Sequence, residues 1–213
     1  MTQAITVVTI SRELGSDGTK IAEAVAAQLG GPALDKQVLS EMARQASVSI
    51  DIILQTEERL LAKQVAVSDE MRAMVGAQRG AAGAMNEVQF IQLLTAAVKA
   101  LAQPGNVVFV GRGAQIILKE HPTALHVHLY APPSVRAARL QQRRSLPNTE
   151  TALRIIQQAD DQRKNWFRHF FSGIDWKNPR HYHLMIDTAR IPIDNAATLI
   201  LEAARVAPSA PLR

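Results

Sequence analysis

A polar turn near the N-terminus holds the residues of this chain that are best suited to binding a phosphate group. The turn, residues 11–18, contains Gly15 and Gly18 and follows the β-branched segment 5–10. Apolar residues then recur at helical spacing over residues 21–29. A strand, a glycine-containing turn and a helix present unpaired amides to an anion at the helix N-terminus. An ordinary strand-to-helix turn, which uses glycine only for its backbone geometry, is the alternative.

The turn departs from the usual phosphate-binding motif at the lysine. That motif reads Gly-x-x-x-x-Gly-Lys-Ser/Thr, with the lysine on the phosphates and the hydroxyl on Mg²⁺. If Thr19 supplies the metal-side hydroxyl, Gly18 stands at the lysine position and Lys20 comes one residue late. The residues expected to hold nucleotide phosphates are Gly15, Ser16, Asp17, Gly18, Thr19 and Lys20, with Thr19 as the candidate metal ligand.

Arg12 lies directly before the glycines and is a candidate for the positive charge that the missing lysine would supply. Phosphoryl transfer requires chiefly that the protein position the phosphates and place positive charge around the moving group. An ion pair with Glu13 or Asp17 is the alternative for Arg12. The sequence leaves both roles open for this side chain.

Arg112 stands between two glycines, directly after the apolar segment 107–110. Such a segment is typical of a buried strand, so its end places a long cation at the edge of a sheet with little bulk around it. Arginine binds phosphate through paired hydrogen bonds. We therefore expect Arg112 to bind an anion, and its alternative is a structural salt bridge with Asp35 or Asp187.

For each of three acidic residues, the sequence allows either a role in ligand binding or a local structural role, such as a helix cap or an ion pair. Asp35 is expected to orient a substrate or its metal, unless it caps the helix that begins near Lys36. Asp160 lies three residues before Arg163 on one helix face, so an intrahelical ion pair is the alternative there. Asp187 ends a predicted strand, and we expect it to cap the following turn rather than to support a metal.

The composition limits the class of protein. The chain has 213 residues, of which 47% are hydrophobic, and it has no cysteine, which excludes disulfides, thiolate catalysis and cysteine-based metal sites. It shows neither a membrane-spanning apolar run nor a secretory signal, so we expect a cytoplasmic protein without a membrane partner. The net charge is +5 and arginine outnumbers lysine 17 to 7. Nucleic-acid binding is disfavoured because the basic residues follow no known binding motif.

Four apolar segments predict the strands of one sheet. They are residues 5–10, 107–110, 125–130 and 184–186. Each leads toward a helical pattern, so we expect a parallel sheet with helices on both faces and a ligand site beyond the carboxyl ends of the strands. His126 and His128 alternate with apolar residues and are expected to be sheet histidines rather than metal ligands. Residues 49–103 are predicted to be mostly helical.

Short motifs along nearly the whole chain resemble those of one family, and in the same order. The matching segments are residues 10–18, 35–36, 108–113, 129–132, 172–176 and 186–188, with Asp160 and Arg163 before the last two. Together they resemble the cytidylate kinase-like family, relatives of the nucleoside monophosphate (NMP) kinases. This resemblance implies an α/β fold with a P-loop-type parallel sheet flanked by helices, and with helical NMP-binding and lid regions.

The resemblance also implies an activity and a division of the chain. The activity is phosphoryl transfer from ATP, with Mg²⁺, to a nucleoside monophosphate, CMP or dCMP. Residues 1–213 would form one domain. Its core would comprise residues 1–48, 104–142 and 183–206, with an NMP-binding region at about 49–103 and a lid at about 143–175.

By the same resemblance, Arg112 grips the phosphate of the acceptor and Arg163 is an arginine of the lid, with Arg168 and Arg143 as companions. The residues expected to act in catalysis are Arg12, Arg112 and Arg163. Those expected to bind the acceptor are Asp35, Arg112 and Arg168.

A nucleotide-binding protein with weak or lost catalysis and a regulatory role is the second interpretation, because Gly18 stands where the motif has lysine. We also expect part of residues 49–103, which are rich in Ala, Met, Val and Leu, to form a homodimer contact. The alternative for this segment is an apolar face that only covers the core.

Overall fold

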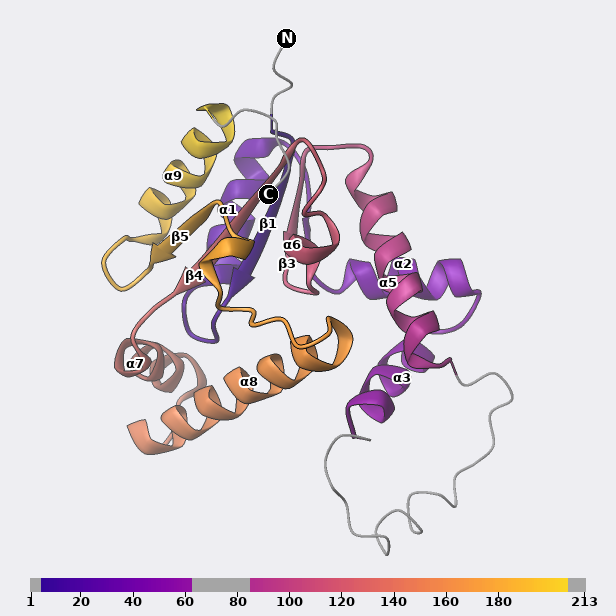
Figure 1. Cartoon of the computed structure of the whole chain (residues 1–213). Coiled ribbons are helices and arrows are strands. Elements are labelled where there is room, and N and C mark those ends of the chain that lie inside the picture. The colour runs from indigo at the N-terminus through magenta and orange to yellow at the C-terminus, as the bar shows by residue number, and fades with distance from the viewer. Residues whose placement is uncertain (1–4, 63–84, 207–213) are drawn as a thin grey trace, which may run out of the picture.

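The computed structural model describes residues 5–62 and 85–206, which form an α/β structure around one sheet (Figure 1). The described strands are β1 (Val7–Arg12), β2 (Ala33–Leu34), β3 (Val107–Val110), β4 (Ala124–Tyr130) and β5 (Leu184–Asp187). Their order is β2-β3-β1-β4-β5, and all neighbouring strands pair in parallel. The predicted parallel sheet is confirmed, with β2 as a short strand at one edge.

Strand β1 begins and ends two residues later than predicted from the apolar segment 5–10. Ser11 and Arg12 continue the ladder opposite His128 and Leu129 of β4. Backbone pairing with β4 extends the strand beyond its apolar residues, which composition alone does not indicate. Consequently Arg12 belongs to the carboxyl end of the central strand rather than to the turn that follows it.

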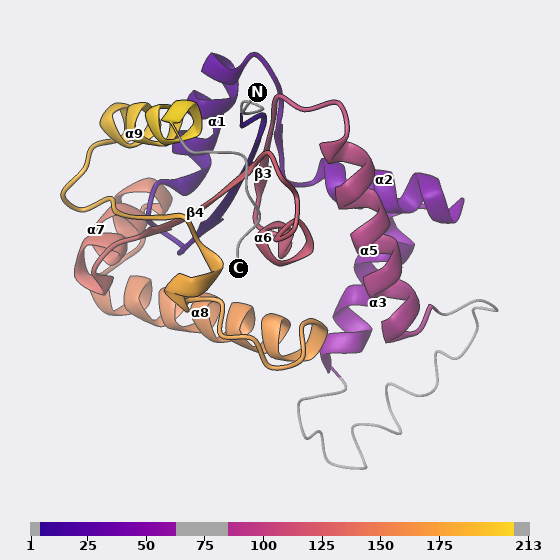
Figure 2. The ribbon, with the colours of Figure 1, turned by 45° about the horizontal axis from the view of Figure 1, so that its top comes forward.

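Helices cover both faces of the sheet and its carboxyl edge (Figures 1 and 2). They are α1 (Gly18–Leu29), α2 (Gln37–Ala46), α3 (Ile50–Ala62), α5 (Glu87–Ala102), α6 (Ala114–Ile117), α7 (Pro133–Arg144), α8 (Thr149–Phe170), α9 (Ile193–Val206) and the 3₁₀ helix η1 (Pro179–His181). One face packs against α1 and α9, and the other packs against α2, α5 and α6. Figure 2 shows α8 as a long bridge between α7 and α3 at the carboxyl ends of the strands.

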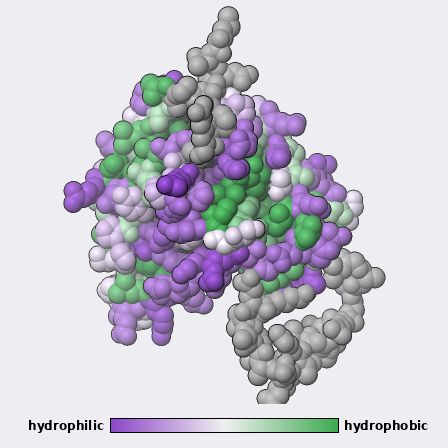
Figure 3. Space-filling view, in the orientation of Figure 1, coloured by the Kyte–Doolittle hydropathy of each residue, from purple (hydrophilic) through white to green (hydrophobic). Residues whose placement is uncertain are grey.

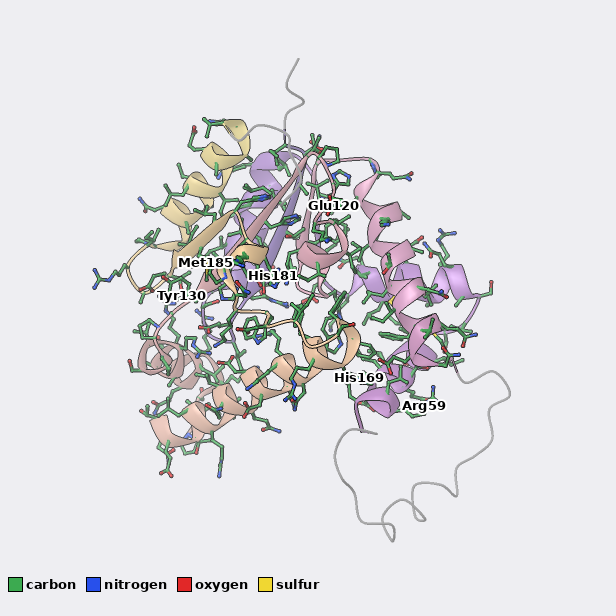
Figure 4. All side chains as sticks on the ribbon, viewed as in Figure 1. Arg59, Glu120, Tyr130, His169, His181 and Met185 are labelled. Carbon is green, nitrogen blue, oxygen red and sulfur yellow. The ribbon has the colours of Figure 1, made fainter. Side chains whose placement is uncertain are left out.

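The helical prediction for residues 49–103 is confirmed where the structure describes that segment. Helix α5 begins after Asn86, whose side chain forms a capping box with Gln89. Arg59 of α3, labelled in Figure 4, donates to the carbonyl of Met85 at 2.5 Å and thereby joins the two helices. Residues 63–84 lie outside the described residues.

The visible surface is mostly hydrophilic, with apolar patches between the polar side chains (Figure 3). Three large apolar side chains of the helical segment are exposed, Ile52 by 44%, Leu54 by 40% and Val88 by 64%. These side chains lie in the segment for which we predict a homodimer contact, which stays a prediction. No described helix is both long and apolar enough to cross a membrane.

His126 and His128 lie buried on the face of β4 that points away from α1 and α9. His126 Nδ1 pairs with the Thr9 hydroxyl at 2.8 Å, and the His128 ring packs against Tyr182 and Trp176. The described residues contain no group of three potential metal ligands. Burial lowers the pKa of His126 to about 3 and that of His128 to about 4. Both are therefore neutral packing residues of the sheet, as predicted.

Acid should destabilise this fold through the two histidines. Because their folded pKa values lie below the ordinary value, the unfolded chain takes up protons first as the pH falls below about 6.5. We expect each histidine to cost about 2 kcal/mol of unfolding free energy between about pH 7.5 and pH 5. Urea unfolding at several pH values measures this slope. His126→Gln should remove part of it, and a slope equal to that of the wild type would contradict the assignment.

Candidate functional site

The turn between β1 and α1 has the backbone of an anion site. Gly15 and Asp17 adopt left-handed backbone angles, with φ of +86° and +61°. Helix α1 then begins at Gly18, and in the described chain the amides of Gly18, Thr19 and Lys20 donate to no backbone carbonyl. Unpaired amides at a helix N-terminus attract anions. Residues 15–20, which we call the phosphate loop, therefore have the backbone geometry that the sequence predicted.

The stem of Arg12 fills the space where the motif lysine would start. A Cβ atom at Gly18 would lie 2.5 Å from Arg12 Cβ and 2.7 Å from Arg12 Cγ, closer than any real contact. Lys20 is exposed on the first turn of α1, as is Thr19. The stem of Arg12, rather than Lys20, thus lies against Gly18 at the lysine position of the loop.

The guanidinium of Arg12 points toward the β2 edge of the sheet. It lies 3.1 Å from the Asp35 carboxylate, so the predicted alternatives, an ion pair with Glu13 or Asp17, were wrong. The capping alternative for Asp35 is wrong as well, because the residue at the cap of α2 is Lys36 and no side chain caps that helix. Asp35 instead fixes the direction of Arg12. The sequence did not indicate this pair, because Arg12 ends β1 whereas Asp35 follows β2, 23 residues along the chain.

Asp17 places a carboxylate inside the phosphate loop, where it would repel an anion. Two arginines of α7 neutralise it, Arg139 at 3.2 Å and Arg143 in a closer ion pair. Arg139 also donates to the carbonyl of Thr188 at 2.6 Å, which fixes its position. The loop thus carries a net positive environment although one of its own side chains is acidic.

A buried network joins the start of the loop to α8. Arg136 of α7 lies 3.2 Å from the Glu13 carboxylate and donates to Asp160 at 3.1 Å. Lys177 completes the network at 2.6 Å from Glu13 and 3.5 Å from Asp160. The alternative for Asp160, an intrahelical ion pair with Arg163, is therefore wrong, because Asp160 pairs with Arg136 and Lys177 instead. The sequence placed Arg136 on a basic helix but gave no sign of this role.

Arg112 occupies a sharp turn at the end of β3. Its φ is +57°, and its neighbours Gly111 and Gly113 have φ of +80° and +67°. Arg112 Nη1 donates to both oxygens of Glu57 on α3, at 2.6 and 2.9 Å. The predicted alternatives, salt bridges with Asp35 or Asp187, were wrong.

Asp187 caps the turn after β5 as predicted, since its carboxylate accepts from the amide of Ala189 at 2.9 Å.

Arg163 of α8 carries a buried cationic atom without a partner in the described residues. That atom is Nη1, and the guanidinium carbon lies 4.9 Å from the centre of the Trp176 ring. Burial and the nearby Arg12 lower the pKa of Arg163 to about 10, so it stays protonated at neutral pH. A buried, charged donor without an acceptor is costly unless a ligand supplies one.

These side chains meet in a cavity of about 1060 Å³ between the strand ends, α3 and α8. Figure 4 shows the side chains of these elements projecting into the region between them. The cavity brings together five sequence-predicted residues: Arg12, Asp35, Arg112, Arg163 and Arg168. Residues 15–20 do not line it. Trp166 and Glu57 also line the cavity, and Glu57 was missed, because it stands in no recognisable motif.

Solved structures show which class of protein has this fold. An uncharacterized protein from Eubacterium ventriosum ATCC 27560 superposes with a TM-score of 0.66 at 19% identity, over 94% of this chain and 98% of that chain. A shikimate kinase from Bacteroides thetaiotaomicron superposes with a TM-score of 0.50 at 14% identity, over 92% and 97% of the two chains. The five-stranded parallel sheet flanked by helices is thus the fold of P-loop kinases.

The family follows from a sequence comparison. The model of the cytidylate kinase-like family matches residues 7–190, so the chain belongs to this family. The family resemblance and the fold predicted from the sequence are confirmed. No curated protein sequence matches the chain.

Removing Arg136 should destabilise the fold strongly. Arg136→Met leaves the Glu13 and Asp160 carboxylates buried with Lys177 as their one remaining network cation. Breaking a buried ion pair from one side costs about 3–5 kcal/mol. Urea unfolding measures this loss, and Arg144→Met, at an exposed position of the same helix, should change stability by less than about 0.5 kcal/mol. Equal stability of the two variants would show that the network is not structural.

Proposed function

We propose that this protein is an ATP-dependent phosphotransferase whose acceptor is a nucleoside monophosphate, CMP or dCMP by analogy with its family. The observation that carries the proposal is the convergence of Arg12, Arg112 and Arg163 on one cavity at the carboxyl edge of the sheet. Phosphate is the natural ligand for several guanidinium groups, because it accepts many charge-assisted hydrogen bonds. The unpartnered Nη1 atom of Arg163 supports an anionic ligand there.

In this proposal the cavity receives the acceptor. Arg112 binds its phosphate, Asp35 and Arg168 contact its polar groups, and Arg163 contributes charge between acceptor and donor. Trp166 offers an aromatic surface in the same cavity. Three arginines around a moving phosphoryl group supply the charge stabilisation that such transfer requires.

The phosphate loop receives the donor ATP. Its free amides suit phosphate oxygens, and the neutralised Asp17 does not repel them. The Thr19 hydroxyl, exposed on the first turn of α1, suits Mg²⁺. Mg²⁺, when bound, neutralises charge on the transferred phosphate. Arg12 starts where the motif lysine would start and takes over its positive charge.

We further assign α3 and α5 to the acceptor-binding region and the stretch of about 143–175, with α8, to a lid. Helix α8 supplies Arg163 and Arg168 and borders the cavity. A lid that carries arginines excludes water from the phosphates when it closes. The proposed homodimer contact involves the exposed apolar side chains of α3 and α5.

A nucleotide-binding protein without catalysis is the second candidate. The observation that favours it is the absence of room for any side chain at Gly18, together with the exposure of Lys20. ATP consumption with a panel of nucleoside monophosphates separates the two candidates. ADP formed only in the presence of an acceptor supports the phosphotransferase. ATP binding without turnover on any acceptor supports the nucleotide-binding protein without catalysis.

Arg12 should matter more than Lys20 for turnover. Arg12→Ala removes the cation at the lysine position of the loop, and losing such a charged contact costs about 1.5–3 kcal/mol, roughly a 10- to 150-fold lower kcat. Lys20→Ala should change kcat by less than about threefold, because the side chain points to solvent. Steady-state ADP formation compares them. The reverse ranking would mean that Lys20 reaches the phosphates.

Arg112→Ala should weaken acceptor binding while ATP binding stays close to that of the wild type. The variant loses a charge-assisted pair with the acceptor phosphate, which amounts to about tenfold or more in Kd. Calorimetric titration with CMP measures the change, and circular dichroism checks the fold. Arg154→Ala, at an exposed position of α8, is the control. Unchanged CMP binding by a folded Arg112→Ala variant would leave Arg112 with a structural role only.

A further inference from the structure

Three elements far apart in the sequence meet at one carboxylate. Glu57 on α3 accepts two bonds from Arg112 Nη1, and its Oε1 also accepts from the Trp166 indole N–H at 2.8 Å. The side chains of Glu57 and Arg112 are only 12% and 22% exposed. The three residues connect α3, the end of β3 and α8. We call them the Glu57 clamp.

The clamp holds a turn that is conformationally unfavourable. Arg112 adopts a left-handed backbone, which a side-chain-bearing residue rarely takes and which costs energy. Aromatic rings at the end of α8 press on the same turn, since a Cβ at Gly113 would lie 2.5 Å from the Phe171 ring and 3.3 Å from that of Trp166. Strain retained at a ligand site points to a positioning role.

Glu57 leaves two of the three guanidinium nitrogen atoms of Arg112 available to a ligand. It engages Nη1 alone, and within the described residues Nη2 and Nε of Arg112 have no hydrogen-bond partner. A guanidinium fixed by one nitrogen keeps an edge with two donors for a bidentate phosphate contact. Glu57 therefore does not have to leave before an acceptor phosphate binds.

Charge makes the clamp necessary. Burial lowers the pKa of Arg12, the Asp35 carboxylate opposes this effect, and the nearby Arg112 lowers the pKa further. Each arginine forms an ion pair with a different carboxylate: Arg12 with Asp35, and Arg112 with Glu57. Without Glu57, repulsion from Arg12 would favour orientations in which Arg112 turns away from the cavity.

We propose that Glu57 is a positioning residue for Arg112, and that Trp166 in turn orients Glu57 and so links α8 to the acceptor phosphate. This inference rests on the proposed function, because it assigns the phosphate of the acceptor to Arg112. It goes beyond that function by naming two residues that act through Arg112 and set acceptor affinity rather than the chemical step.

The test uses Glu57→Gln, which keeps the shape of the side chain and removes its charge. The KM for CMP and the calorimetric Kd for CMP should rise about tenfold, with kcat changed by less than about threefold, since affinity and not chemistry is affected. Trp166→Phe should raise KM by about two- to fivefold, because it removes the indole donor and keeps an aromatic ring at this position. Glu202→Gln makes the same chemical change at an exposed position of α9, outside the acceptor-binding region, and should leave both constants unchanged.

Tighter CMP binding by Glu57→Gln would overturn the inference, because Glu57 would then be a competitor that occupies Arg112. Unchanged CMP binding would overturn it as well.

A second readout needs no ligand. The chain has two tryptophans, so the Trp166 indole signal in a ¹H–¹⁵N spectrum is assigned by its loss in Trp166→Phe. Glu57→Gln and Arg112→Lys should both shift it.

The two readouts separate the two proposals. If the wild type binds neither CMP nor any other nucleoside monophosphate, the proposed function fails, and the indole shifts still decide whether the clamp exists. If monophosphates bind but the Trp166 indole signal does not respond to Glu57→Gln or Arg112→Lys, the clamp is wrong and the proposed function stands.

Discussion

Repulsion among partly buried guanidinium groups is the constraint on which this site depends. Arg12, Arg112 and Arg163 share one cavity, and burial together with neighbouring arginines lowers the pKa of Arg12 and of Arg163. Like charges in a partly dehydrated space stay together only when fixed acids offset part of the charge. Asp35 and Glu57 do so, each for one arginine. Nη1 of Arg163 has no hydrogen-bond acceptor among the described residues, so the cavity still attracts an anion.

The same principle governs the phosphate loop. Its acidic side chain, Asp17, would oppose phosphate binding, and two arginines of α7 neutralise it. Glu13, one residue beyond Arg12, is buried and pairs with the buried Arg136 and with the exposed Lys177. The loop is thus held by ion pairs to α7 and to the segment after α8, and Arg12 is free to point toward the cavity. A loop without the motif lysine remains electropositive because its surroundings supply the charge.

The sequence predicted the features that depend on local pattern. β-Branched segments located the central strands, and glycines marked the turn after β1, which follows Arg12, and the turn after β3, which contains Arg112. The partners of these arginines depend on topology instead. Glu57 is 55 residues from Arg112 in the sequence. Asp35 comes close to Arg12 because the strands take the order β2-β3-β1, and the spacing of residues along the chain does not indicate that order. Sequence reasoning therefore identified the cations of the site and Asp35, but it identified neither Glu57 nor the pairing of each acid with its arginine.

The central claim is that the cavity recognises the phosphate of its acceptor. Calorimetric titration of the wild-type protein with each nucleoside monophosphate and with the matching nucleoside tests it most directly. For at least one pair, the monophosphate should bind about 100-fold more tightly, because only it engages the arginines. Equal affinity for nucleoside and monophosphate in every pair, or no binding of either, would contradict the account.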